Sequence, residues 1–427
     1  MEDYAQASGE VPLIYPVPMV FRGQLDRQVA LLSVKDRSAS LAIGHDWVAA
    51  WDLGGRLYSL WKAGRLHRRG LNGRMVRKWR DDGRSGPADG GSRRVQTGRD
   101  EADAIVQEAA GAMRAAVESI AREPFAWTTK DGQRPDAAAV AVAGRCARFD
   151  AAASRADAET FSRVFRPVGI LPPDQYLSIV LQATEGCSFG TCTFCDLYRD
   201  GYRVKSAAEF ARHAEAVRDY LGDSARLRSR SIFLGAANAL AVPMSRLVEF
   251  LEAAAAVFGR PVPPVHAFVD GFTGARKSAG DYAVLRAAGL RRVYVGLESG
   301  HDPLLEFVRK PASRDLVVQA VRAIKDGGVA VGVIVMIGLG GTRFAAGHVE
   351  DTVAAVNAMA LGPDDLLFFS DLVEGPGTAY PGRAAAADVG ALDPGDRQRQ
   401  LEAIRAGLSF PGQRPHLARY DVEEFVY

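Results

Sequence analysis

The chain has 427 residues, of which 48% are hydrophobic and 24% are charged, and its formal net charge is +2. This length and composition allow one large buried core and a smaller one, and the small net charge is no reason by itself to expect a polyanionic partner. Four cysteines are too few for a disulfide framework, and without a signal-like or membrane-length apolar run we expect a cytoplasmic protein with no membrane partner.

Residues 1–100 contain short apolar runs separated by Gly and Asp. The runs are VALLSV, SLAIG, WVAAWDL and RLYSLW. Short runs of this kind between turn residues predict a small β-rich amino-terminal region. The stretch DDGRSGPADGGSRR, residues 81–94, is typical of a loop or linker.

Residues 61–80, WKAGRLHRRGLNGRMVRKWR, are strongly basic and carry Trp61 and Trp79 at their ends. Aromatic and basic side chains in alternation can stack bases and pair phosphates, which makes RNA a candidate partner. The same pattern fits a solvated basic hairpin face whose tryptophans belong to the core. We favour the second interpretation.

Residues 101–167 form the next predicted segment, a helical connecting region. Its clearest signal is the helical spacing of Ile105, Ala109, Met113, Val117 and Ile120. Cys146, alone in an Ala-rich stretch of the same region, is predicted to be a small buried side chain.

Residues 168–385 alternate short apolar runs with amphipathic helical stretches. We expect six strands, over residues 176–183, 231–236, 265–270, 292–298, 329–338 and 365–372. Strands alternating with helices predict an α/β fold with a parallel sheet and right-handed crossovers, and six units predict a partial (β/α)6 barrel. Residues 386–427 are predicted to be a short carboxy-terminal extension. The functional face should lie at the carboxyl ends of the strands.

The stretch TEGCSFGTCTFCDLY, residues 184–198, follows the first of these strands and therefore lies on that face. It brings together Cys187, Cys192 and Cys195. Three thiolates on one loop can hold a four-iron cluster and leave one iron open. Zinc is the alternative, but it would need a fourth ligand, for which His213 and Cys146 are the candidates.

The cysteine loop and several later segments carry a family resemblance. Three cysteines with an aromatic residue before the third resemble the cluster loop of the radical S-adenosylmethionine (SAM) superfamily. RVYVGLESGHDPLLEFVRKPASRDLVVQAVRAIKDGGVAVGVIVMIGLGG resembles the second half of the core shared by the Elongator catalytic subunit and oxygen-independent coproporphyrinogen oxidase. The cysteine loop with its continuation CTFCDLYRD, together with FLGAANALAVP and GLESGHD, resembles one bacterial group within the superfamily that has four residues between the first two cysteines. The resemblance covers residues 170 to 380. Four residues separate the first two cysteines where three are usual, so the loop must bulge by one residue.

The resemblance implies a set of cofactor residues. Cys187, Cys192 and Cys195 would ligate a [4Fe-4S] cluster. The implied SAM-binding residues are Phe194, Gly235, Ala236, Glu298, Ser299, Gly338 and Ser370. Where relatives carry an acidic residue for the amino group of SAM this chain has Ala236, so Glu298 is expected to take part of that role. Lys310 could face the SAM carboxylate, although an exposed lysine is the simpler expectation.

Three more residues are placed on the same face, where they could bind substrate or move a proton: Asp270, Tyr198 and Glu374. Only Cys146 remains outside the motif, which excludes a second cluster and favours single-cluster chemistry.

The activity implied by the resemblance is reductive cleavage of SAM to a 5′-deoxyadenosyl radical, which abstracts hydrogen from a substrate. The leading substrate is a small molecule, with phosphorylated metabolites included, and an electron donor such as flavodoxin or ferredoxin is expected. The alternatives are a radical SAM enzyme that modifies RNA through the basic region and, behind it, a non-enzymatic iron–sulfur or zinc protein.

Overall fold

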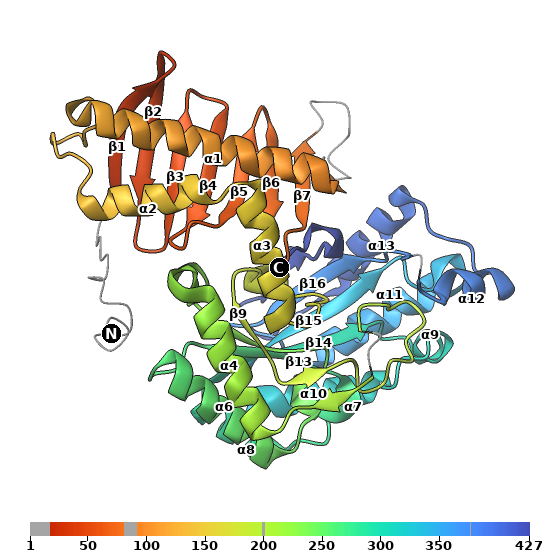
Figure 1. The fold of residues 1–427 in the computed structure, drawn as a ribbon. Helices are drawn as coiled ribbons and strands as arrows, with labels where there is room; N and C mark the ends of the chain where they lie inside the picture. Colours follow the sequence, from red (N-terminus) through yellow and green to blue (C-terminus); the bar gives the residue numbers. More distant parts are fainter. Residues whose placement is uncertain (1–17, 81–91, 199–200, 376) are drawn as a thin grey trace.

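The computed structural model describes residues 18–80, 92–198, 201–375 and 377–427. Figure 1 shows two bodies, an amino-terminal sheet with helices in front of it and a larger α/β body below. Residues 81–91 of the predicted loop lie outside the described residues. In the described part of the chain, no helix is both long and apolar enough to cross a membrane.

The amino-terminal body is an eight-stranded antiparallel sheet in which each strand pairs with the next along the chain. This confirms the predicted β-rich region. The strands are β1 (Met19–Leu25), β2 (Gln28–Val34), β3 (Ser38–Ile43), β4 (Trp47–Asp52), β5 (Leu57–Lys62), β6 (Arg65–Arg69), β7 (Met75–Arg80) and β8 (Ser92–Gln96).

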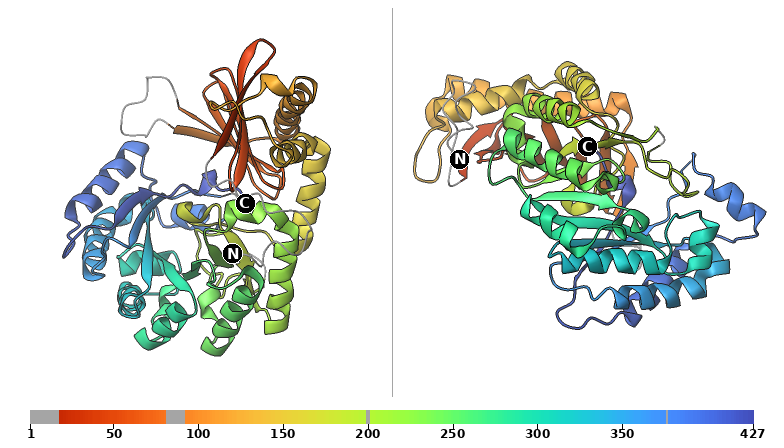
Figure 2. Two further views of the ribbon diagram at one scale, coloured as in Figure 1. Left: turned by 90° about the vertical axis from the view of Figure 1, so that its left-hand side faces the viewer. Right: turned by 90° about the horizontal axis from the view of Figure 1, so that it is seen from below.

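Two helices, α1 (Arg99–Arg122) and α2 (Ala137–Arg148), cover one face of this sheet (Figures 1 and 2). The register aligns Leu32, Leu41, Ala49 and Leu60 on that face, and all four belong to one core with residues of both helices. Cys146 on α2 is fully buried in this core, as predicted, and burial raises its pKa.

The opposite face of the sheet carries exposed apolar side chains. Leu31, Val48 and Trp61 are aligned there across the strands, and Trp61 is 41% exposed. The expectation that both tryptophans belong to the core is therefore wrong for Trp61. Its register position puts it on the face that α1 and α2 do not cover.

The basic side chains of residues 61–80 mostly have partners within the chain. Lys62 pairs with Glu108, Arg77 with Glu101 and Lys78 with Glu424. Arg69 donates to the Ser154 hydroxyl and carbonyl, and the Arg68 guanidinium lies over the Tyr176 ring. Lys62 and Arg77 therefore pair within the amino-terminal body, whereas Arg68, Arg69 and Lys78 contact the rest of the chain.

The larger body is built on a seven-stranded parallel sheet with the strand order β17-β16-β15-β14-β13-β12-β9. The strands are β9 (Ile179–Gln182), β12 (Ile232–Gly235), β13 (Val265–Val269), β14 (Leu290–Glu298), β15 (Ala330–Ile337), β16 (Leu366–Asp371) and β17 (His416–Arg419). All six predicted strands are confirmed, and β17 adds a seventh from the predicted carboxy-terminal extension. The edge strands β17 and β9 are not paired with each other in the described residues, so the sheet is open like a partial barrel.

The long helices of this body form one layer, because each contacts the next along the layer. They are α4 (Ala207–Leu221), α6 (Met244–Phe258), α8 (Ala279–Ala287), α10 (Arg314–Asp326), α11 (Gly341–Ala358) and α13 (Pro394–Gly407). The short elements are β10 (Thr184–Glu185), β11 (Arg203–Val204), α5 (Ala225–Arg228), α7 (Gly271–Gly274), α9 (Asp302–Phe307), α12 (Tyr380–Ala386) and the 3-10 turns η2 (Pro124–Ala126), η3 (Pro173–Gln175), η4 (Gly222–Ser224), η5 (Ala239–Ala241) and η6 (Val422–Glu424).

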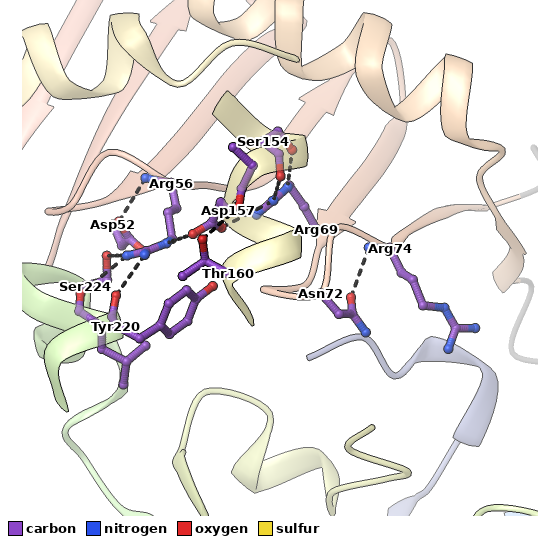
Figure 3. A network of polar contacts seen from close by, with 12 residues as sticks. Asp52, Arg56, Arg69, Asn72, Arg74, Ser154, Asp157, Thr160, Tyr220 and Ser224 are labelled. Carbon is purple, nitrogen blue, oxygen red and sulfur yellow. Dashed lines mark hydrogen bonds and ion pairs between the residues drawn. The ribbon is translucent and has the colours of Figure 1, made fainter. Parts of the chain in front are cut away.

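A buried polar network joins the two bodies (Figure 3). Arg56, in the turn between β4 and β5, donates to Asp157 on α3 (Ala151–Val164) at 2.8 Å. The same guanidinium donates to the Ser224 hydroxyl at 2.6 Å and to the Tyr220 carbonyl at 2.9 Å, at the end of α4. One arginine thus ties the sheet, the connecting helix and the α/β body together.

The segment 420–427 also lies between the two bodies, and we call it the carboxy-terminal strap. Arg94 on β8 pairs with Asp421 at 2.5 Å and with Glu423 at 3.1 Å. The Tyr427 ring is buried, and its hydroxyl accepts from the Val180 amide at 3.0 Å and donates to the Ser178 carbonyl. The strap therefore links the edge strand β9 to the amino-terminal sheet.

Three buried histidines predict how stability depends on pH. Burial lowers the pKa of His213, His266 and His348 to about 4. In the unfolded chain these groups titrate near 6.5, so between about pH 4 and pH 6.5 the unfolded state binds more protons than the folded state. The free energy of unfolding should fall as pH decreases through this window, by up to about 1.4 kcal/mol per pH unit for each histidine.

Thermal unfolding at pH 7.5 and pH 5 tests this expectation. His213→Gln should unfold with a weaker pH dependence, because a glutamine oxygen can still accept from the Gln182 amide while carrying no titrating group. An unchanged dependence in this variant would contradict the assignment.

Candidate functional site

A cavity of about 380 Å³ lies at the carboxyl ends of the strands. Its walls come from segments far apart in the sequence: the cysteine loop, the residues after β12 and β13, the ends of β14 and β16, and the carboxy-terminal strap. The polar and sulfur-bearing lining residues include Cys187, Ser188, Cys192, Cys195, Asp196, Tyr198, Asn238, Asp270, Glu298, Lys310, Ser370 and Asp371. The parallel sheet therefore brings the predicted cysteine loop and Glu298 into one cavity.

The cysteine loop is held by backbone hydrogen bonds at its centre. The Thr193 amide donates to the Val308 carbonyl at 3.0 Å, and the Tyr380 amide donates to the Thr193 carbonyl at 2.9 Å. Burial raises the pKa of Cys192 to about 11, against the opposing effect of the nearby Lys310 charge. Without a metal this thiol is protonated near neutral pH, so metal binding must release its proton.

The donor set on the cavity wall is three cysteines of one loop, which is the set that a four-iron cluster with one open iron takes. In the described residues, no three His, Cys, Asp or Glu side chains are gathered as ligands of one ion. In a four-iron cluster each cysteine binds a different iron, so the thiolates need not converge on one point. The two candidates for a fourth zinc ligand are engaged elsewhere, because His213 Nε2 accepts from the Gln182 amide and Cys146 is buried in the amino-terminal core.

Glu298 and Lys310 form an ion pair in the cavity wall. Lys310 Nζ lies 2.9 Å from Glu298 Oε1, and the two side chains are only 10% and 11% exposed. Burial works against the charge of Lys310, but the Glu298 carboxylate, together with the nearby Cys192 and Asp270, raises the pKa of the lysine. The simpler expectation of an exposed Lys310 is wrong, because the chain folds back after α9 and brings Lys310 over the end of β14.

The backbone at the end of β14 is shaped for this pair. Glu298 has a φ of 60°, in the left-handed region, and follows a break in the β14–β15 register. A Cβ added to Gly296 would lie 2.1 Å from Glu298 Oε1 and 3.0 Å from Lys310 Nζ. Glycine at position 296 thus leaves room for both charged groups to turn into the cavity.

Asp270 is held in a network of hydrogen bonds. Its carboxylate accepts from the Thr273 amide at 2.8 Å, from the Thr273 hydroxyl at 2.5 Å and from the Asn238 amide group. Asn238 also donates to the Ser188 hydroxyl at 2.8 Å and is 2% exposed. Asp270 therefore positions the loops after β12 and β13, and most of its hydrogen-bonding capacity is already used.

The other predicted site residues divide into two groups. Phe194, Tyr198 and Ser370 line the cavity, and the Tyr198 hydroxyl is directed at the Ile170 carbonyl, 3.5 Å away. The second group does not line it: Gly235, Ala236, Ser299, Gly338 and Glu374.

Members of the second group have other surroundings. Gly235 and Ala236 line a small neighbouring cavity, and Glu374 is exposed. The Ser299 hydroxyl is buried, lies 2.8 Å from His348 Nδ1 and accepts from the His301 amide. The Gly338 amide donates to Gln400 Oε1.

Three further residues line the cavity and are absent from the sequence-based predictions: Asn238, Tyr420 and Val422. Asn238 lies three residues after Gly235, where β12 ends. Its position just after a strand could therefore have predicted that it lies at the cavity. Tyr420 and Val422 line the cavity from the carboxy-terminal strap. Their contribution depends on β17, whose four residues gave no clear strand pattern.

Comparison with known proteins gives one family match. Residues 181–350 match the model of the radical SAM superfamily. This region begins in β9 and ends in α11, and it includes the cysteine loop, Glu298 and Lys310. No curated protein sequence matches the chain significantly.

Solved structures show only distant likeness. Coproporphyrinogen III oxidase (HemN) from Escherichia coli is 15% identical over 58% of this chain and 54% of its own, with a TM-score of 0.42. The archaeal Methanocaldococcus infernus Elp3 is 11% identical over 58% and 61%, with a TM-score of 0.38. The cobalamin-dependent SAM radical enzyme OxsB is 12% identical over 54% of this chain and 31% of its own, with a TM-score of 0.37. Likeness at this level supports no conclusion about substrate.

Proposed function

We propose that this protein holds one [4Fe-4S] cluster and SAM in its cavity and abstracts hydrogen from a small-molecule substrate, a proposal supported by the match of residues 181–350 to the radical SAM superfamily. The observation that carries this proposal is one cavity lined by Cys187, Cys192 and Cys195 together with the buried Glu298–Lys310 pair. When bound, the reduced cluster and SAM supply the electron and the 5′-deoxyadenosyl group with which the superfamily takes hydrogen from a substrate.

The protein's own part is to bind and orient these groups. The three thiolates leave one iron open for SAM. Glu298 would accept a hydrogen bond from the SAM ammonium group, and Lys310 would pair with the SAM carboxylate. Glu298 and Lys310 already pair with each other. The amino acid group of SAM carries both charges, so it can replace this one ion pair with two: ammonium to Glu298 and carboxylate to Lys310.

The remaining polar residues shape the cavity. Asn238 and Asp270 fix the loops after β12 and β13, and Ser370 at the end of β16 offers a hydroxyl to the ribose. Phe194, immediately before Cys195, would lie near the adenine. Tyr198 is a candidate for substrate contact, and its hydroxyl keeps its proton near neutral pH because burial raises its pKa.

A small molecule is a better candidate than RNA. In the basic segment 61–80, Lys62, Arg69, Arg77 and Lys78 contact partners in the same chain, so half of its eight Lys and Arg side chains are already engaged and fewer remain for phosphates. We further propose a cytoplasmic location, with a flavodoxin- or ferredoxin-like protein as the electron donor.

A test of the proposed function is SAM cleavage in the absence of substrate. The anaerobically reconstituted protein should bind about four irons per chain and, with a strong reductant, slowly form 5′-deoxyadenosine. Chromatography of the products with time measures this reaction. Stoichiometric zinc without visible absorbance, or iron-loaded protein that never forms 5′-deoxyadenosine, would exclude the proposal.

A further inference from the structure

Exposed apolar side chains lie at the cavity. Leu197 and Val373 line the cavity and are 41% and 36% exposed. Tyr202 is 38% exposed and lies close enough to Asp270 and Cys187 for both charges to affect its pKa. Large apolar side chains that are exposed at a cavity are typical of a binding surface.

In the part of the chain that the structure describes, the charged groups that line the cavity leave no cation free. Among the described lining residues Lys310 is the only Lys or Arg, and it is paired with Glu298. On the proposed function, the carboxylate of SAM would take any remaining capacity of Lys310. The other charged lining residues are carboxylates, and Asp371 is itself paired with Arg419 at 2.7 Å.

Much of the rest of the cavity wall is made of apolar side chains, which cannot pair with a charged substrate. Phe268, Ile334, Met336, Leu372 and Val422 contribute apolar side chains. Tyr420 also lines the cavity, but its hydroxyl donates to the Leu171 carbonyl at 2.8 Å, so its ring is what remains for a ligand.

We propose that the substrate group entering this cavity is apolar and uncharged, and that phosphorylated substrates are excluded. This inference rests on the proposed function, because it assigns Lys310 to the cofactor. A phosphate placed here would lose its hydration and find carboxylates in place of cations. An apolar group would instead gain from leaving water against the mouth and wall.

Two probes that share a ring and differ in charge can test the proposal: 1-naphthol and 1-naphthyl phosphate. Each is titrated by fluorescence into reconstituted protein with SAM and no reductant. 1-Naphthol should bind at least about tenfold more tightly, since one uncompensated charge costs about 1.4 kcal/mol or more.

Variants at the mouth supply the specificity test. Val373→Glu should weaken 1-naphthol binding several-fold, whereas Val373→Lys should strengthen binding of 1-naphthyl phosphate. Val48→Glu is the matched control, because Val48 is 37% exposed but lies on the open face of the amino-terminal sheet. It should change neither affinity.

Equal or tighter binding of the phosphate, no binding of 1-naphthol, or equal effects of Val373→Glu and Val48→Glu would overturn the proposal. Iron content and 5′-deoxyadenosine formation are measured on the same preparations. If those succeed while the probe result fails, only the substrate inference is wrong. If those fail, the proposed function is wrong.

Discussion

Cys192→Ala protein, reconstituted anaerobically, should retain at most a small fraction of the iron and sulfide bound by the parent and should form no 5′-deoxyadenosine. The variant removes one of three thiolates, and two thiolates cannot hold a stable four-iron cluster. Iron and sulfide analysis and visible absorbance measure the loss. The fold should survive, because the loop is anchored through the backbone of Thr193 and the variant leaves those hydrogen bonds in place.

Cys146→Ala is the matched control for this experiment. It also removes one thiol, but this thiol is buried in the amino-terminal core and does not line the cavity. It should keep the parent's iron content, at some cost in thermal stability from the lost sulfur contacts. Full iron in Cys192→Ala, or equal loss in both variants, would refute the cluster assignment.

The sequence predicted the strands of the α/β body because each is a continuous apolar run that the fold buries. The same logic placed Cys187, Cys192, Cys195 and Glu298 together, since parallel strands end at one edge of their sheet. These predictions needed only local pattern and the handedness of the crossovers.

Other features depend on contacts between distant segments, which one sequence does not specify. Lys310 looked like a surface lysine, and only the path of the chain after α9 makes it the buried partner of Glu298. Trp61 looked like a core residue, but the strand register points it away from the helices. The strap residue Val422 reaches the cavity only because β17 joins the sheet next to β16.

Glu298→Gln should keep the cluster and weaken SAM binding about tenfold or more. The change leaves the three thiolates untouched and preserves the size of the side chain, but it removes the charge that would face the SAM ammonium group. Loss of a charge-assisted hydrogen bond costs about 1.5–3 kcal/mol, and about 1.4 kcal/mol corresponds to one decade in affinity. Equilibrium binding of SAM to the oxidised, iron-loaded protein measures the effect without turnover.

Asp371→Asn is the matched control, because Asp371 also lines the cavity but forms an ion pair with Arg419. Its effect on SAM affinity should be much smaller. Lys310→Met separates the two roles within the pair: if Lys310 faces the SAM carboxylate, this variant weakens SAM binding as well. If Lys310 serves only to neutralise Glu298, its removal frees the carboxylate and SAM binds at least as tightly as to the parent. Parent-like SAM binding by Glu298→Gln would show that the buried pair holds the end of β14 in place and takes no part in cofactor recognition.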